Sequence, residues 1–109
     1  MSRDSGLEEL IGQELAGRDG VSQKPMFGGF AFLLNGNLLC AARNDGMLVR
    51  LGKGNDGWAL ALEGIELMVM GERRMNGWVR AGVAAYGDDA LRRRLIRAAI
   101  KFVESLPAK

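Results

Sequence analysis

The chain has 109 residues but no histidine, no threonine and only one cysteine. Histidine is the commonest general base and the usual zinc ligand, so its absence excludes every Ser-His and Cys-His nucleophilic pair. The single cysteine, Cys40, can form neither a disulfide nor a structural zinc site within one chain. We therefore predict no catalytic residue, no metal ligand and no cofactor, and we expect the protein not to be an enzyme.

Long hydrophobic runs are also absent. No segment approaches the roughly 18 apolar residues of a membrane span, and residues 1–10 do not resemble a signal peptide. The scarcity of cysteine is typical of a reducing compartment. A chain of this length can bury a core without disulfides as one domain, which we place at 1–109. We expect a soluble, cytoplasmic, single-domain protein with no membrane partner.

An acidic pair and two glycine-rich segments have structural explanations that are simpler than a role in catalysis or phosphate binding. Asp88 and Asp89 precede a periodic apolar segment, where carboxylates cap a helix and interact favourably with its dipole. The glycine-rich segments 28–29 and 52–57 lack the P-loop order of residues, and the first of them precedes a strand and not a helix. We predict that the glycines of both segments have a structural role in the backbone and do not form a phosphate-binding loop.

The charged residues are dominated by arginine, with eleven Arg, four Lys and a formal net charge of +2. Arginine is suited to bidentate contacts with carboxylate or phosphate, and several of these residues lie close together in the last predicted helix. A solvated helix face is the simpler interpretation. The alternative is a nucleic-acid or other anionic partner bound by Arg92, Arg93, Arg97 and Lys101, with Arg73, Arg74 and Arg80 nearby.

Apolar spacings of three and four predict two main helices. The first begins at the capping box Ser5-Gly6-Leu7-Glu8 and carries one apolar stripe that ends before Gly17. The last extends from the Asp88-Asp89 cap to Pro107, and segment 58–63 is compatible with a short middle helix. Residues 21–24 are predicted to be a connector.

Five strands are predicted, at 30–34, 37–43, 47–51, 65–70 and 78–83. Asn35-Gly36 predicts a two-residue type I′ turn, which pairs Phe32 with Leu39. The segment 44–46 predicts a three-residue loop, which pairs Ala41 with Val49, whereas a two-residue loop would turn the third strand over. Met68 and Met70 alternate along the fourth predicted strand, and both are predicted to be core filler. The fold class is a two-layer α+β fold with an antiparallel sheet of about five strands and helices at both ends of the chain.

Alternation along the first three strands gives the sheet two unequal faces. The face predicted to lie beneath the helices holds Phe30, Phe32, Leu34, Leu39, Ala41, Met47, Val49 and Leu51. The opposite face is less aromatic but still apolar, and its dimer candidates are Leu33, Leu38, Cys40 and Leu48. Exposed, it would be larger than the apolar patches that monomers usually tolerate, so we predict a homodimer that forms through this face or an adjoining sheet edge. The alternative is that the first helix covers this face.

Four segments in this order resemble the N-terminal domain family of the TfoX/Sxy competence regulators: 26–30, 46–51, 74–79 and the closing helix that runs into 106–109. The resemblance implies an α+β fold similar to secretion chaperones, and a regulatory or protein-interaction role with an unknown protein partner. In the regulators this domain is followed by a helical C-terminal domain. The present sequence contains only the first of the two, so we expect a stand-alone N-terminal domain. The family supplies no catalytic residue, and its motif residues are interpreted as structural: Met26, Phe27, Gly28, Gly29, Gly77 and Trp78.

Overall fold

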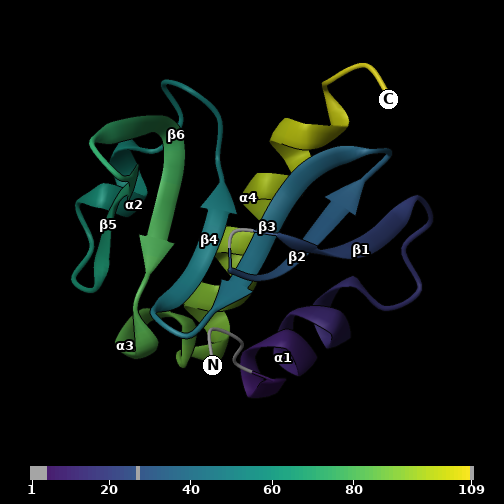
Figure 1. Cartoon of the computed structure of the whole chain (residues 1–109), viewed down its shortest axis with the longest axis horizontal. Helices are drawn as coiled ribbons and strands as arrows, with labels where there is room; N and C mark the ends of the chain where they lie inside the picture. Colours follow the sequence, from purple (N-terminus) through teal and green to yellow (C-terminus); the bar gives the residue numbers. More distant parts are fainter. Residues whose placement is uncertain (1–4, 27, 109) are drawn as a thin grey trace.

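The computed structural model describes residues 5–26 and 28–108 of the chain. Within these residues it has an α+β fold, as predicted, with one sheet and with helices before, between and after its strands in the chain (Figure 1). The elements in chain order are α1 (Ser5–Leu15), β1 (Val21–Met26), β2 (Gly29–Leu34), β3 (Asn37–Arg43), β4 (Gly46–Arg50), α2 (Gly57–Leu60), β5 (Ile65–Met70), β6 (Arg73–Ala81), α3 (Val83–Tyr86) and α4 (Asp89–Glu104).

The strands form one antiparallel sheet in the order β1-β2-β3-β4-β6-β5. It has six strands because Val21–Met26, which was predicted to be a connector, pairs with β2. This strand lies at the edge of the sheet and is mostly exposed, so its polar residues need no apolar alternation. Pro25 fits there because an edge strand tolerates the missing N–H.

One face of the sheet is covered by helices. The predicted stripe of α1 is buried, and so is the inner side of α4, which lies behind β3 and β4 in Figure 1. Together they form the main core with the sheet. Its largest fully buried members are Leu7, Ile11, Phe32, Leu34, Leu39, Met47, Val49, Leu51, Leu95 and Ile96. Burial of this many large apolar side chains supplies most of the driving force for folding.

The first hairpin has the predicted turn and an unpredicted bulge. Asn35 and Gly36 both have positive φ, 54° and 82°, as a type I′ turn requires, and Leu34 faces Asn37. The register then shifts, so that Phe32 pairs with Cys40 and not with Leu39. A bulge lets two successive residues face the same side. Leu39 and Cys40 accordingly both join the main core.

The second hairpin closes on two residues, because Arg43 pairs with Gly46. The predicted three-residue loop was therefore one residue too long. The predicted pairing of β2 with β3 was also wrong by one position, because the bulge was not foreseen. The two shifts cancel beyond the turn, so Met47 and Val49 face the helices as predicted. Between the bulge and the turn they do not cancel, and Ala41 moves to the opposite face.

The remaining differences lie at element ends. β6 begins at Arg73, five residues earlier than predicted, α2 is shorter, and α3 was not predicted. The cap of α4 is confirmed, since the Asp88 carboxylate accepts the Leu91 N–H at 3.1 Å. The side-chain cap of α1 at Ser5 lies outside the described side chains. No helix of the described part is long and apolar enough to span a membrane.

Candidate interaction surface on the open sheet face

The sheet face opposite the helices carries its own apolar cluster, which we call the strand cluster. Five strands contribute its buried members, Ala31, Ala41, Leu48, Met68 and Trp78, and Met26, Leu38 and Met75 pack against them. All eight residues belong to strands. Within the described part of the chain no helix residue joins them, and we therefore call this surface the open face.

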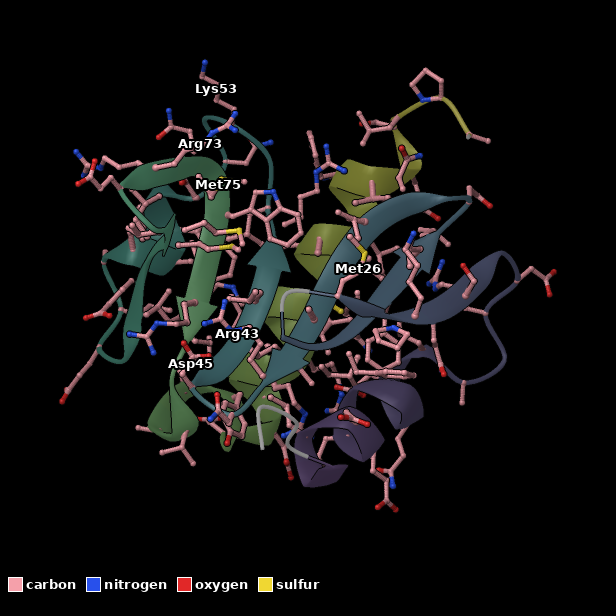
Figure 2. The ribbon with its side chains drawn as sticks, viewed as in Figure 1. Met26, Arg43, Asp45, Lys53, Arg73 and Met75 are labelled. Atoms are coloured by element: carbon pink, nitrogen blue, oxygen red, sulfur yellow. The ribbon has the colours of Figure 1, made fainter. Side chains whose placement is uncertain are left out.

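The open face is hollowed. A depression of about 530 Å3 is lined by Lys24, Met26, Leu33, Gly36, Leu38, Arg50, Met68, Met75 and Trp78. Met26 and Met75 extend toward its centre from β1 and β6, which lie on opposite sides of the sheet centre (Figure 2). Methionine is flexible and polarizable, so such a surface can adapt its shape to an apolar partner.

Charged groups also lie on the open face outside the hollow, and most of them are held in ion pairs. The Arg43 guanidinium donates to both oxygens of Asp45, at 2.9 and 2.8 Å. Arg80 donates to the Asp45 carbonyl at 2.8 Å and also pairs with the Glu66 carboxylate. Within the described part of the chain Lys24 has no ion-pair partner. The open face therefore presents both signs of charge, with Lys24, which lines the hollow, on one edge strand and Glu66 on the other.

Arg50 closes one end of the hollow. Its guanidinium donates to the Leu38 carbonyl at 3.3 Å, and its Cζ lies 6.0 Å from the centre of the Trp78 ring and 5.6 Å from that of Phe102. Both distances fit a cation–π contact. Arg50 thus fixes the indole that forms part of the apolar floor.

The family-motif residues support this face through the backbone and through side chains. Met26 and Trp78 line the hollow, whereas Gly29 and Gly77 permit close approaches. A Cβ on Gly29 would lie 2.1 Å from the Ala42 carbonyl oxygen, and one on Gly77 would lie 2.7 Å from the Lys53 nitrogen. Gly28 has a φ of 70°. Phe27 lies outside the described residues.

Three of the four residues predicted to form the dimer face do lie on the open face. Leu33 and Leu38 line the hollow, and Leu48 is a buried member of the strand cluster. Cys40 was placed there wrongly. The bulge turns its side chain into the main core, where it is 0% exposed.

The Arg-rich helix does not present the charges that its sequence suggests. Arg92 is only 5% exposed, and its guanidinium donates to the Tyr86 carbonyl at 2.9 Å and pairs with Asp89 at 2.9 Å. Arg93 lies 3.5 Å from Glu14, and Arg94 stacks over the Trp58 ring at 4.2 Å. Arg92 therefore cannot contact an anionic partner as predicted.

Arg97 and Lys101 remain exposed and form no ion pair within the described part of the chain. The other candidates do not join them, because Arg80 lies on the open face and Arg73 and Arg74 begin β6. No cluster of three or more potential metal ligands occurs among the described residues. The structure thus places a separate apolar cluster on the open face and leaves Arg97 and Lys101 of α4 without ion pairs among the described residues.

Sequence reasoning missed several residues of this surface. Lys24 and Met26 were assigned to a connector and a motif, and Met75 to a turn. The available signal was alternation along β6, which places Trp78 and Arg80 on one face. Of the two residues predicted to be core filler, Met68 is buried, in the strand cluster, whereas Met70 is 38% exposed, so the prediction was wrong for Met70.

A six-stranded antiparallel sheet with helices on one face defines an α+β fold with a single helical layer. The family model of the TfoX N-terminal domain matches residues 13–103, which is most of the chain. The protein therefore belongs to the TfoX N-terminal domain family, as its motifs predicted. Searches of curated proteins and of solved structures found no match, so the similarity to secretion chaperones stays a prediction.

Proposed function

We propose that this protein is a non-enzymatic regulatory domain that acts through protein contacts and pairs with a second copy of itself through the open face. The observation that carries the proposal is the strand cluster, which five strands build on the sheet face that none of the described helices covers. Membership of the TfoX N-terminal domain family supports a regulatory setting. An unidentified protein would then bind the dimer.

The charges at the two edges of the open face favour a second copy as the occupant. Lys24 lies on β1 and Glu66 on β5, the two edge strands of the sheet. In a face-to-face pair whose two-fold axis runs along the strands, the β1 edge of each copy lies over the β5 edge of the other. Lys24 of one copy then meets Glu66 of the other, and the apolar hollows are buried between them.

We expect light scattering after size exclusion to give twice the mass of one chain at a few hundred micromolar. Leu38→Asp, which puts a charge into the hollow, should weaken association by at least tenfold, because burying an unpaired carboxylate is costly. Val83→Asp is the matched control, since Val83 is 71% exposed on α3. Circular dichroism establishes that both variants remain folded. A single-chain mass for the unaltered protein would overturn the homodimer.

An exchange of charges tests the direction of the two-fold axis in the proposed dimer. Lys24→Glu should weaken the dimer, and adding Glu66→Lys should restore it, because the exchanged charges face each other again across the interface. Restoration in the double variant requires the β1-over-β5 arrangement. Failure to restore it, with Leu38→Asp still dissociating the dimer, would contradict this axis and retain the face.

The alternative, a nucleic-acid-binding helix, has weaker support because Arg92, Arg93 and Arg94 are engaged within the chain. We expect no measurable affinity for duplex DNA or for RNA at 50 mM salt. Fluorescence anisotropy at two salt concentrations tests this, since phosphate contacts make affinity fall steeply as salt rises. Salt-sensitive binding that is lost in an Arg97→Gln, Lys101→Gln variant would favour the alternative.

A further inference from the structure

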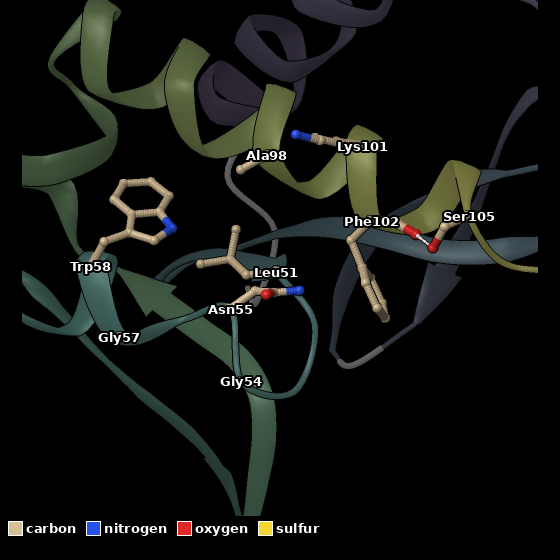
Figure 3. Close-up of a pocket in the computed structure, with 9 residues that line it drawn as sticks. All are labelled: Leu51, Gly54, Asn55, Gly57, Trp58, Ala98, Lys101, Phe102 and Ser105. Carbon is tan, nitrogen blue, oxygen red and sulfur yellow. Dashed lines mark hydrogen bonds between the residues drawn. The ribbon is translucent and has the colours of Figure 1, made fainter.

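A second cavity, distinct from the open face, lies between the segment 51–58 and α4. It encloses about 600 Å3, a volume typical of small-molecule sites. Its walls are mainly apolar, with Leu51 and Trp58 on the loop side and Ala98 and Phe102 on the helix side (Figure 3). We call it the side cavity.

The backbone holds the side cavity open. The N–H groups of Leu51 and Gly52 both donate to the Gly77 carbonyl, at 2.8 and 3.1 Å, which ties the start of the loop to β6. The chain then turns, with the Asn55 N–H donating to the Gly52 carbonyl at 2.9 Å. On α4, Ala98 and Phe102 are one turn apart on the facing side, and the loop does not fill the space between them and Trp58.

The side cavity has one lining cation and two neutral polar side chains. Lys101 carries the positive charge, Asn55 has an amide that can donate or accept, and the Ser105 hydroxyl donates to the Phe102 carbonyl. The Trp58 indole N–H is on the edge of the ring that is turned toward the cavity (Figure 3). The Arg94 guanidinium, stacked 4.2 Å over the same ring, adds a second positive charge. None of the nine lining residues carries a carboxylate.

We propose that the side cavity binds a small apolar monocarboxylate, with its hydrocarbon part against Leu51, Ala98 and Phe102 and its carboxylate at Lys101. Apolar walls with a few convergent polar groups are the usual composition of a ligand site. An anion is selected because the positive charges face no lining acid, and a charge-assisted hydrogen bond to an ammonium group is strong. This inference is independent of the dimer.

Titration of the 15N-labelled protein, followed by two-dimensional NMR, tests the proposal. Octanoate is the probe. Acetate supplies the carboxylate without the chain, and octylammonium supplies the chain without the anion. The two tryptophans report separately, since Trp58 lines the side cavity and Trp78 the open face. Octanoate should shift the Trp58 indole N–H at millimolar concentration and bind at least tenfold more tightly than either control ligand.

Variants locate the carboxylate. Lys101→Gln should weaken octanoate binding about tenfold, while Arg97→Gln, a cation on the same helix outside the cavity lining, should change it less than twofold. Ala98→Leu should abolish binding by filling the cavity. Equal affinity for octylammonium, an unchanged affinity in Lys101→Gln, or octanoate shifts at Trp78 in place of Trp58 would each overturn the proposal.

Discussion

A Gly77→Ala variant is expected to lose about 3 kcal/mol of its free energy of unfolding. Gly77 has a φ of 90°, a conformation that costs an L-residue roughly 1–2 kcal/mol. A Cβ there would also lie 2.7 Å from the Lys53 nitrogen and 2.8 Å from the Gly52 carbonyl carbon, both of which are backbone atoms. Relieving that contact moves the loop and weakens the two N–H bonds to the Gly77 carbonyl, which adds a further 1–2 kcal/mol or so. Urea unfolding measures the loss.

Gly54→Ala is the matched control for Gly77→Ala. Its φ is 88°, almost the same, but no atom lies within 4 Å of a Cβ at this position. It should therefore show the conformational cost alone, about 1 kcal/mol. Equal losses in the two variants would contradict the account in which Gly77 is required by the close approach of residues 52–53.

Elements with strong local signals could be predicted from the sequence. The stripe of α1, the Asp88 cap of α4 and the Asn35-Gly36 turn each depend on residues within a few positions of one another. Local signals of this kind act before tertiary contacts form, so they can be recognised without knowing the partners. The α+β class followed from them.

The register of β3 could not be predicted, for a physical reason. A bulge at Leu39 is selected by packing, and Leu39 and Cys40 are both apolar, so alternation does not distinguish the bulged arrangement from the regular one. β1 was missed for the opposite reason, because an exposed edge strand needs no apolar pattern.

The candidate surface was foreseen in part. Leu33 and Leu38 were placed on the open face because the type I′ turn fixes their register. The hollow itself depends on β1 and β6 bringing Met26 and Trp78 to one surface from positions 52 residues apart. No local pattern encodes such a meeting. The side cavity likewise depends on how the loop 51–58 is tied to β6.

Cys40 provides a direct chemical test of the bulge. The regular register would place its thiol on the open face beside Leu38, whereas the structure buries it in the main core. Burial raises the pKa of the Cys40 thiol from its ordinary value of 9.0 to about 12, because the thiolate is poorly solvated there. The thiolate is the reactive form, so both protonation and access protect the sulfur.

We expect iodoacetamide at pH 8 to alkylate Cys40 at least about a hundredfold more slowly in the folded protein than in 6 M urea, because burial both raises the pKa of the thiol and blocks access to the sulfur. The folded rate should keep rising with pH toward about 12, whereas the unfolded rate should level off above pH 9. Leu38→Cys in a Cys40→Ala background is the matched control, because it places a thiol two positions away on the same strand but in the hollow, where it should react readily once the protein is diluted enough to dissociate the proposed dimer. If Cys40 in the folded protein reacted as fast as this control, its side chain would face outward, and the bulge at Leu39 would have to be abandoned.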